Sequence, residues 1–295
     1  EHYFGNIQKM RKHLETDRQI LWVTYYRNLY NATHPSEINS PVSLSRNLLA
    51  WNQPGTNGLI LPVNPSASFL SILFANELWF TLGDMTMAEH CAMLSMIFSP
   101  RNSGSRMIKR LAEINLVNGD DEAALKYLRI LDKTLLHKSW AEKRIPGQQT
   151  PRVKEWLEKK RRDIPTQDQL RSGNDAVTSL RNLVASNAGN LRAYEYLLCY
   201  HLLSKDLRSF VEDYVPGKVS SPIFAEALLI YLARQGNIRA EELIKYQIPV
   251  EIAKEFADYT RIYEAKDTSL KEKYGKTYWF YYHFATTEPG KESKP

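Results

Sequence analysis

The residue types best suited to metal chemistry are scarce in this chain of 295 residues, and they come close together only once. No two of the seven histidines lie three or four positions apart, and neither HExxH nor CxxC occurs. The one group of soft ligands is Met87, His90 and Cys91, with Met93 and Met96 nearby, and on one helix face it could hold Cu(I). The same residues suit the apolar face of a packed helix. We favour that structural interpretation and predict no metal site and no cofactor.

Motifs for covalent or phosphate chemistry are also missing. The sequence has no GxxxxGK[ST], no GxGxxG and no GxSxG. Cys91 and Cys199 lie in the apolar strings HCAML and LLCYHLL, which are typical of buried free thiols. Asp120 and Asp121 stand at the start of a helical run, where carboxylates stabilise the free amide donors. We therefore predict no catalytic residues and no enzymatic activity.

The positive charge is concentrated in one segment. The chain has 39 Lys and Arg against 33 Asp and Glu, and the whole excess lies between Lys138 and Arg162. We predict a short helix between Pro151 and Pro165, with Trp156 facing inward beside Leu157. A solvated helix face would explain its charges. The functional alternative is a basic patch that binds anionic lipid headgroups or an acidic partner, whereas nucleic acid is not expected. The residues of this patch would be Lys154, Lys159, Lys160, Arg161 and Arg162.

The segment from Tyr274 to Phe284 holds seven aromatic residues in eleven positions. A helix that is aromatic all round must be largely covered, so we expect it to cap the last helices of the fold. An exposed interface or a belt against a membrane is the alternative. Both interpretations rest on the same residues, Tyr278, Trp279, Tyr281 and Tyr282.

The elements that would position these residues are helices. Apolar residues recur every three to four positions from Leu21 to Tyr30 and from Leu70 to Leu82, and in separate segments at Leu180 and Leu183 and from Tyr194 to Leu202. The expected helix starts are a capping box at Thr86 and Glu89 and a cap at Ser221 before Pro222, and the expected helix ends are Gly83, Gly119 and Gly236. The stretch Gly58 to Val63 is expected to be an ordered loop rather than a strand.

The helices also form pairs. Gly83 and Asp84 make a turn with Ala88 five positions after the glycine, and Gly119 with Asp120 repeats this pattern with Ala124. Weaker copies have turns at Lys205 and at Gly236. The pattern resembles the tetratricopeptide repeat. We expect an all-α fold, arranged as an irregular antiparallel helix-pair solenoid of the tetratricopeptide type. The whole chain, residues 1–295, is expected to form a single domain. This domain could divide near residues 145–174 into N-terminal repeats 1–144 and C-terminal repeats 175–295.

A further resemblance covers most of residues 1–284. The blocks VTYYRNLYNA, RLAEINLVNGDDEAALKYLRILDKTL, AYEYLLCYHLLSKDL and YGKTYWFYYHF are similar to those of an uncharacterised Bacteroidetes family of multi-pass membrane proteins, in which transmembrane helices precede a helical-repeat part. The resemblance implies an anchor and no known activity. The chain itself has no apolar run of about 20 residues, and it starts at Glu1 rather than Met, so we expect the anchor upstream of Glu1.

These observations together predict a function by architecture. We expect a non-enzymatic scaffold for protein–protein interaction, the soluble part of a membrane-anchored bacterial protein, with an unknown protein or peptide partner. The expected location is the inner membrane, with the periplasmic side favoured. The alternative is a small-molecule-binding or enzymatic domain with a pocket between helices.

Overall fold

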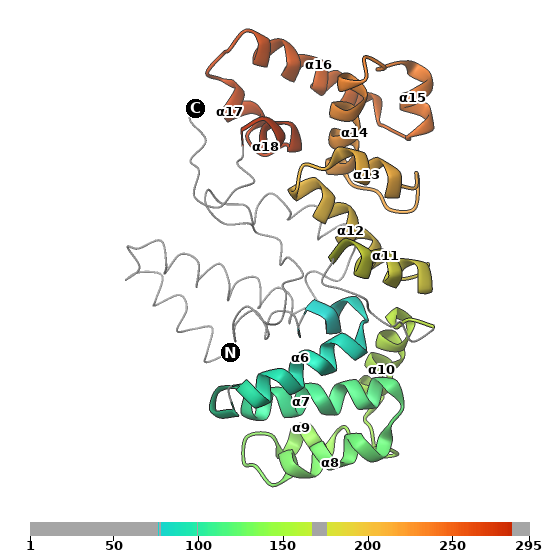
Figure 1. Cartoon of the computed structure of the whole chain (residues 1–295), viewed down its shortest axis with the longest axis vertical. Helices are drawn as coiled ribbons and strands as arrows, with labels where there is room; N and C mark the ends of the chain where they lie inside the picture. Colours follow the sequence, from blue (N-terminus) through green and yellow to red (C-terminus); the bar gives the residue numbers. More distant parts are fainter. Residues whose placement is uncertain (1–75, 77, 99, 167–175, 285–295) are drawn as a thin grey trace. The chain divides into compact units, whose positions relative to one another are not determined.

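The computed structural model describes residues 76, 78–98, 100–166 and 176–284, and every regular element in these ranges is a helix (Figure 1). The all-α class is therefore confirmed for this part of the chain. The expected helix at Leu21–Tyr30 and the expected loop at Gly58–Val63 lie outside the described residues, as does the tail after Phe284.

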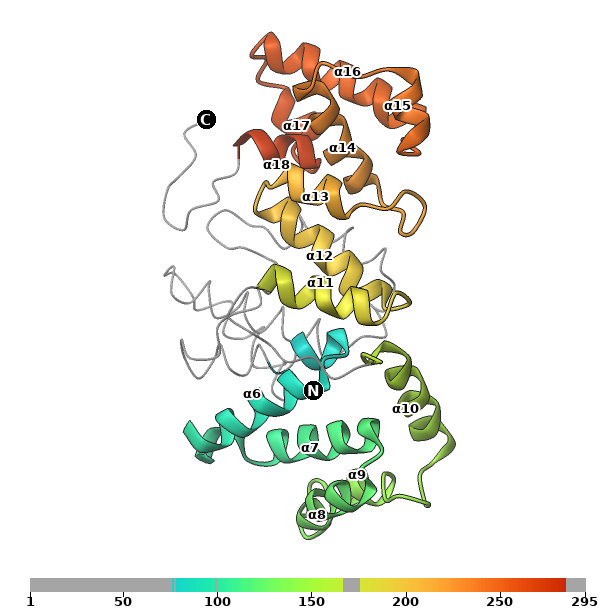
Figure 2. The ribbon, with the colours of Figure 1, turned by 45° about the vertical axis from the view of Figure 1, so that its right-hand side comes forward.

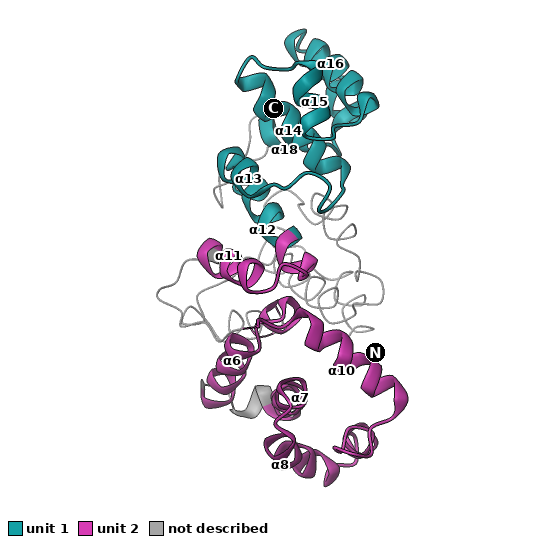
Figure 3. Cartoon of the chain, turned by 90° about the vertical axis from the view of Figure 1, so that its right-hand side faces the viewer, with its two compact units in different colours: residues 1–59, 195–295 teal, residues 60–194 magenta. Residues whose placement is uncertain are grey.

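The chain divides into two compact units, coloured in Figure 3, and within the described residues the boundary between them falls after Tyr194. The subdivision predicted near residues 145–174 lies within unit 2. Unit 2 is described over residues 76–194 and holds helical residues 78–82, followed by α6 (Met85–Phe98), α7 (Pro100–Asn118), α8 (Asp121–Asp132), α9 (Lys138–Glu142), α10 (Pro151–Asp163) and α11 (Ala176–Ser186). Unit 1 is described over residues 195–284 and holds most of α12 (Leu191–Leu203), then α13 (Leu207–Asp213), α14 (Pro222–Arg234), α15 (Ala240–Lys245), α16 (Val250–Glu264), α17 (Leu270–Tyr274) and α18 (Tyr278–Phe284).

In unit 2, α7 is the central helix and packs on α6, α8 and α10, while α8 also packs on α9 (Figure 2). Small residues let the helices approach closely. Ala92 of α6 is completely buried against Met107 and Leu111 of α7, and Ala112 of α7 packs with Leu128 of α8. The core of this unit is therefore a series of apolar helix faces.

Six helix ends in the described residues have the same type of turn. A residue with positive φ ends the helix, and the next residue donates its N–H to the carbonyl five positions earlier, at 2.8–3.2 Å. This is the Schellman arrangement, and it satisfies a carbonyl that the helix leaves free. The residues with positive φ are Gly83, Gly119, Lys205, Gly236, Gln247 and Lys266. The three predicted glycine ends are thus confirmed, and so is the turn predicted at Lys205.

At three of these turns an aspartate follows and caps the next helix. Asp84, Asp120 and Asp206 accept hydrogen bonds from backbone amides three positions on, at 2.9, 2.9 and 3.1 Å. The predicted capping box at Thr86 and Glu89 is therefore wrong, because α6 already begins at Met85 and Asp84 supplies the cap. Ser221 does precede α14 with Pro222 in its first turn, as predicted, although its side chain makes no capping bond.

Unit 1 is organised around α14, which packs on α13, α16 and α18. Eight residues of this helix are buried, so it is apolar on nearly every side. Tyr259 of α16 and Trp279 of α18 are completely covered and pack on each other with ring centroids 5.5 Å apart. The aromatic segment from Tyr274 onward thus contributes to the core of this unit.

Candidate functional site

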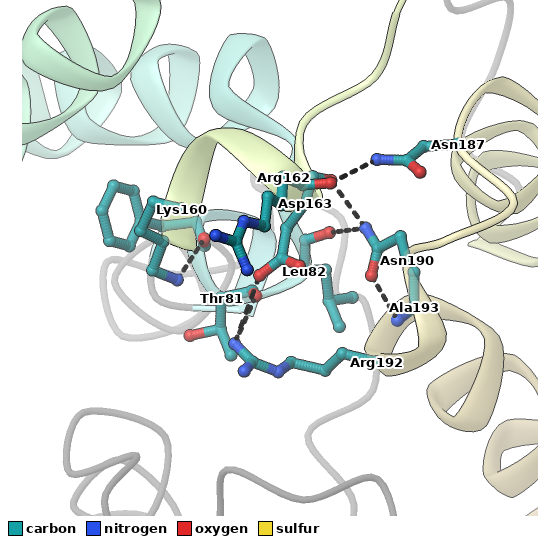
Figure 4. A network of polar contacts seen from close by, with 10 residues as sticks. Thr81, Leu82, Lys160, Arg162, Asp163, Asn187, Asn190, Arg192 and Ala193 are labelled. Carbon is teal, nitrogen blue, oxygen red and sulfur yellow. Dashed lines mark hydrogen bonds and ion pairs between the residues drawn. The ribbon is translucent and has the colours of Figure 1, made fainter. Parts of the chain in front are cut away.

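A network of polar contacts in unit 2 surrounds the end of helical residues 78–82 (Figure 4). The last carbonyls of a helix lack partners within it and carry partial negative charge. Here three successive carbonyls accept hydrogen bonds from side chains far along the sequence: Phe80 O from Lys160 Nζ at 3.2 Å, Thr81 O from Arg192 Nη1 at 3.2 Å, and Leu82 O from Asn190 Nδ2 at 2.7 Å. Two of the three donors are cationic side chains, which suit the negative end of a helix dipole.

The same asparagine joins two further helix ends. Asn190 Nδ2 also donates to Asp163 O, at the last residue of α10, over 2.8 Å, and Asn190 Oδ1 accepts from Ala193 N in the first turn of α12 at 3.0 Å. Asn187 supports this end of α10 by donating to Arg162 O at 2.7 Å and to Ile164 O at 3.0 Å. Because Asn190 is 1% exposed, its amide connects helical residues 78–82, α10 and α12 away from water.

Gly83 permits this close approach. Its φ of +93° lies in the left-handed region, and a Cβ on this residue would stand 2.2 Å from Asp163 O and 3.2 Å from Asn190 Nδ2. Any side chain would therefore push α10 away from the end of helical residues 78–82. Gly119 has a similar φ of +82° with nothing within 4 Å of such a Cβ, so of these two glycines Gly83 alone combines both constraints.

Lys160 contributes a buried ammonium to this network: the residue is 9% exposed, and Nζ donates to the Phe80 carbonyl. The pKa of Lys160 is lowered to about 7. Burial is the largest cause, the charges of Arg192 and Arg110 also lower it, and Asp163 and Glu113 raise it. The ammonium lies 4.7 Å from the centroid of the Phe80 ring. A lysine with this pKa has the basicity of a catalytic amine, but its nitrogen points at the Phe80 carbonyl.

One of the five residues of the predicted basic patch therefore does not belong to the surface. Lys160 is buried, and Arg161 turns its guanidinium to the end of α7, donating to Leu116 O at 2.8 Å and Val117 O at 3.0 Å. Arg161 is nevertheless exposed as a whole, as are Lys154, Lys159 and Arg162 along α10. Glu155 and Glu158 separate these cations on the helix surface. Whether the four exposed residues bind a partner stays a prediction.

The four predicted aromatic residues lie in α18 and bond to neighbouring helices. Tyr278 Oη and Tyr281 Oη donate to Leu202 O and Leu203 O at the end of α12, both at 2.8 Å. Trp279 Nε1 donates to Glu226 O at 3.0 Å. Tyr278 and Trp279 are fully buried and Tyr281 nearly so, whereas Tyr282 is partly exposed and its hydroxyl accepts from Arg234 Nη1. The hydroxyls of α18 thus close a helix end within unit 1.

Unit 1 also contains a partly buried carboxylate at the start of this aromatic helix. Glu226 of α14 accepts a hydrogen bond from Tyr278 N at 2.5 Å. Burial raises the pKa of Glu226 to about 7, the backbone bond from Tyr278 lowers it and nearby Glu255 raises it. The contact fixes the start of α18 to α14.

The cysteines are buried as expected. Burial raises the pKa of Cys91 to about 12, and it also raises the pKa of Cys199. Cys91 is completely covered, whereas His90 and Met93 of the same helix are exposed, so the soft-ligand group does not converge. The described ranges hold no group of three His, Cys, Asp or Glu side chains placed to bind a metal ion.

The sequence interpretation missed the asparagines. Asn190 directly precedes an apolar helical run, and this position could have identified it as a helix cap. Nothing in the sequence indicates that its amide reaches Leu82 and Asp163, because those contacts join segments 108 and 27 positions away.

The described residues thus define an all-helical protein in which buried polar side chains join helix ends. A family model described as a family of unknown function (DUF6057) matches residues 7–285, and the chain belongs to this family. No curated protein and no solved structure matches the chain. Among the helices that the structure describes, none is both long enough and apolar enough to span a membrane.

Proposed function

We propose that this chain is a non-enzymatic scaffold that binds another protein. The observation that supports it is the use of the buried polar groups in unit 2. Lys160, Asn190 and Arg192 donate to three successive backbone carbonyls at one helix end. Such contacts hold helices in fixed positions, which a binding surface built across several helices requires.

The finer architecture within this proposal is a solenoid of the tetratricopeptide type. Two features support it: the turns at Gly83 and Gly119 are each followed by a capping aspartate, and Ala88 and Ala124 are completely buried five positions after the glycine. Small residues at that position allow close helix crossing. A crystal structure of the full chain would test the arrangement, and an arrangement without stacked helix pairs would contradict it.

The proposed cellular context is the soluble part of a membrane-anchored protein from Bacteroidetes, on the periplasmic side of the inner membrane. The resemblance of the sequence blocks to multi-pass membrane proteins supports this. The complete reading frame in the source genome is the test, because hydrophobic helices upstream of Glu1 and the Lys and Arg counts in their flanking loops give anchor and orientation together. A reading frame that encodes no hydrophobic helices would contradict the proposal.

The binding function itself is tested by crosslinking in the native cells. We expect a tagged full chain to crosslink to a defined protein, and we expect that protein to bind the purified chain in a titration. The variant Asn190→Asp, which disturbs the helix ends, should bind the same protein more weakly. The absence of any protein enriched above an untagged control would contradict the scaffold proposal.

The alternative is a small-molecule or enzymatic function, and one observation favours it. Burial lowers the pKa of Lys160 to about 7, which would suit an amine that reacts with a carbonyl compound. Incubation of the full chain with carbonyl metabolites and borohydride, followed by mass spectrometry, distinguishes the two functions. An adduct at Lys160 that is absent after Lys160→Arg would favour the enzyme, and an unmodified Lys160 would favour the scaffold.

A further inference from the structure

Two adjacent leucines of unit 2 project into solvent at the turn between α8 and α9. Leu135 is 103% and Leu136 is 88% exposed, the largest exposed fractions of any large hydrophobic residue that the structure describes. Single exposed apolar residues are common on protein surfaces. Two neighbouring leucines with almost no contact to the rest of the protein are unusual. Ile130, at the end of α8, adds a third side chain that is 50% exposed.

The turn holds these leucines outward. Thr134 donates its amide N–H to Leu131 O at 3.0 Å and its hydroxyl to the same oxygen at 2.7 Å, and Lys138 N donates to Thr134 O at 3.0 Å. On either side, Leu131 and Ala141 are completely buried in one core cluster. Because both ends are fixed in this way, the leucines cannot fold back onto the core without breaking these bonds.

The surroundings of the turn are cationic. Residues 126–144 contain six Lys and Arg against Asp132 and Glu142, and Lys133 and Lys138 are exposed directly beside the leucines. Glu142 lies 3.9 Å from Lys138 in an ion pair between exposed groups, which neutralises little. Trp140, partly buried in α9, lies under the guanidinium of Arg144 at 4.0 Å. The turn therefore combines protruding apolar side chains, flanking cations and a nearby tryptophan.

We propose that residues 133–138, the Leu135–Leu136 turn, insert into the surface of a lipid bilayer that carries anionic headgroups. The two leucines would enter the boundary between headgroups and acyl chains, and Lys133 and Lys138 would contact the phosphates. A bilayer fits better than a protein partner, because fluid acyl chains accept a protruding pair of any shape, whereas a protein needs a matching pocket. This contact is separate from any anchor upstream of Glu1 and does not depend on the proposed scaffold function.

Sedimentation with vesicles tests the contact. The full chain is mixed with vesicles of phosphatidylglycerol and phosphatidylcholine in equal amounts, and with vesicles of phosphatidylcholine alone. We expect binding to the anionic vesicles that weakens at high salt, and a loss of at least about tenfold in the partition coefficient for Leu135→Ser with Leu136→Ser. Each charge near an anionic surface is worth about fivefold in binding, so Lys133→Gln with Lys138→Gln, which removes two charges, should weaken binding by about 25-fold.

A matched control comes from unit 1. Ile244 and Val250 are 77% and 56% exposed, and replacing both with serine removes two exposed apolar side chains elsewhere. We expect this control to bind the anionic vesicles within twofold of the original chain. Unchanged binding of the double leucine variant, or no binding of the original chain to anionic vesicles, would overturn the proposal.

A spectroscopic probe tests insertion directly and keeps the proposal testable if a variant folds poorly. Because Cys91 and Cys199 are buried, a cysteine introduced by Leu135→Cys can be labelled selectively with an environment-sensitive dye. Anionic vesicles should shift its emission to shorter wavelength, and the same dye at Ile244→Cys should not respond. An unshifted spectrum at position 135 would reject the proposal, and a shift caused by protein concentration without vesicles would assign the turn to self-association instead.

Discussion

Replacing Gly83 by alanine should damage unit 2 far more than the same change at Gly119. Both glycines end helices with similar positive φ values, +93° and +82°. A Cβ at Gly83 would stand 2.2 Å from Asp163 O, whereas nothing lies within 4 Å of a Cβ at Gly119. The two variants therefore share the backbone strain and differ in the collision with α10.

The expected magnitudes follow from these distances. A left-handed backbone costs an alanine about 1–2 kcal/mol, which is the whole effect expected for Gly119→Ala. Ordinary contact needs about 3.5 Å, so at Gly83 the end of α10 must withdraw by about 1 Å. That movement breaks the bonds of Asn190 to Leu82 O and Asp163 O, each worth about 1 kcal/mol. We therefore expect Gly83→Ala to lower the free energy of unfolding by about 3–4 kcal/mol.

Urea unfolding of both variants, followed by far-ultraviolet circular dichroism, measures the difference. We expect the midpoint of Gly83→Ala to fall well below that of Gly119→Ala, while the dependence of the free energy on urea stays unchanged. Equal unfolding free energies for the two variants, within about 0.5 kcal/mol, would refute the argument that close approach to α10 requires a glycine at this position.

Three further predictions concern the buried polar groups. Asn190→Asp keeps the oxygen that caps α12 but loses the amide donor. It should therefore lower the melting temperature of the protein nearly as much as Asn190→Ala does. An aspartate variant as stable as the original chain would contradict the bridging role of Asn190. Lys160 has a pKa of about 7 when folded and 10.5 when unfolded, so the unfolded chain binds more protons between these values and stability should rise with pH by up to about 1.4 kcal/mol per unit. Unfolding titrations at pH 7–9 should show that Lys160→Met removes this rise in stability. An unchanged pH dependence in the variant would contradict the assignment of the rise to Lys160. Glu226 has a pKa raised from 4.5 to about 7, so folding favours its protonated form and stability should fall as pH rises from about 4.5 to 7. Glu226→Gln should flatten that fall at pH 5–7, and a variant that keeps it would show that another group titrates.

The sequence predicted helix ends better than helix contacts. Gly83, Gly119 and Gly236 were identifiable because glycine tolerates positive φ and followed apolar runs. Gln247 and Lys266 adopt the same conformation without any local signal. The capping residue of α6 was misassigned because Thr86 and Glu89 have the spacing of a capping box, whereas Asp84 directly after the turn is closer to the free amides.

The basic segment shows a different limit. Its charge count could be read from the sequence, but the roles of single residues could not. Lys160 and Arg161 are neighbours in sequence, yet they donate to the ends of two different helices, at Phe80 and at Leu116 and Val117. Residues next to each other on a helix point about 100° apart, and only the packing of other helices around α10 decides which carbonyls they reach.

The amino-acid sequence by itself determined that the described part of this protein is helical, where several helices end, and that Cys91 and Cys199 are buried, because these properties depend on local spacing and side-chain type. The tertiary structure decided what the polar residues do. Asn190 became a bridge, Lys160 became a buried amine with a lowered pKa, and Leu135 with Leu136 became an exposed pair. Burial and hydrogen bonding depend on which segments meet in space, and long-range contacts of this kind leave no periodic pattern in the sequence.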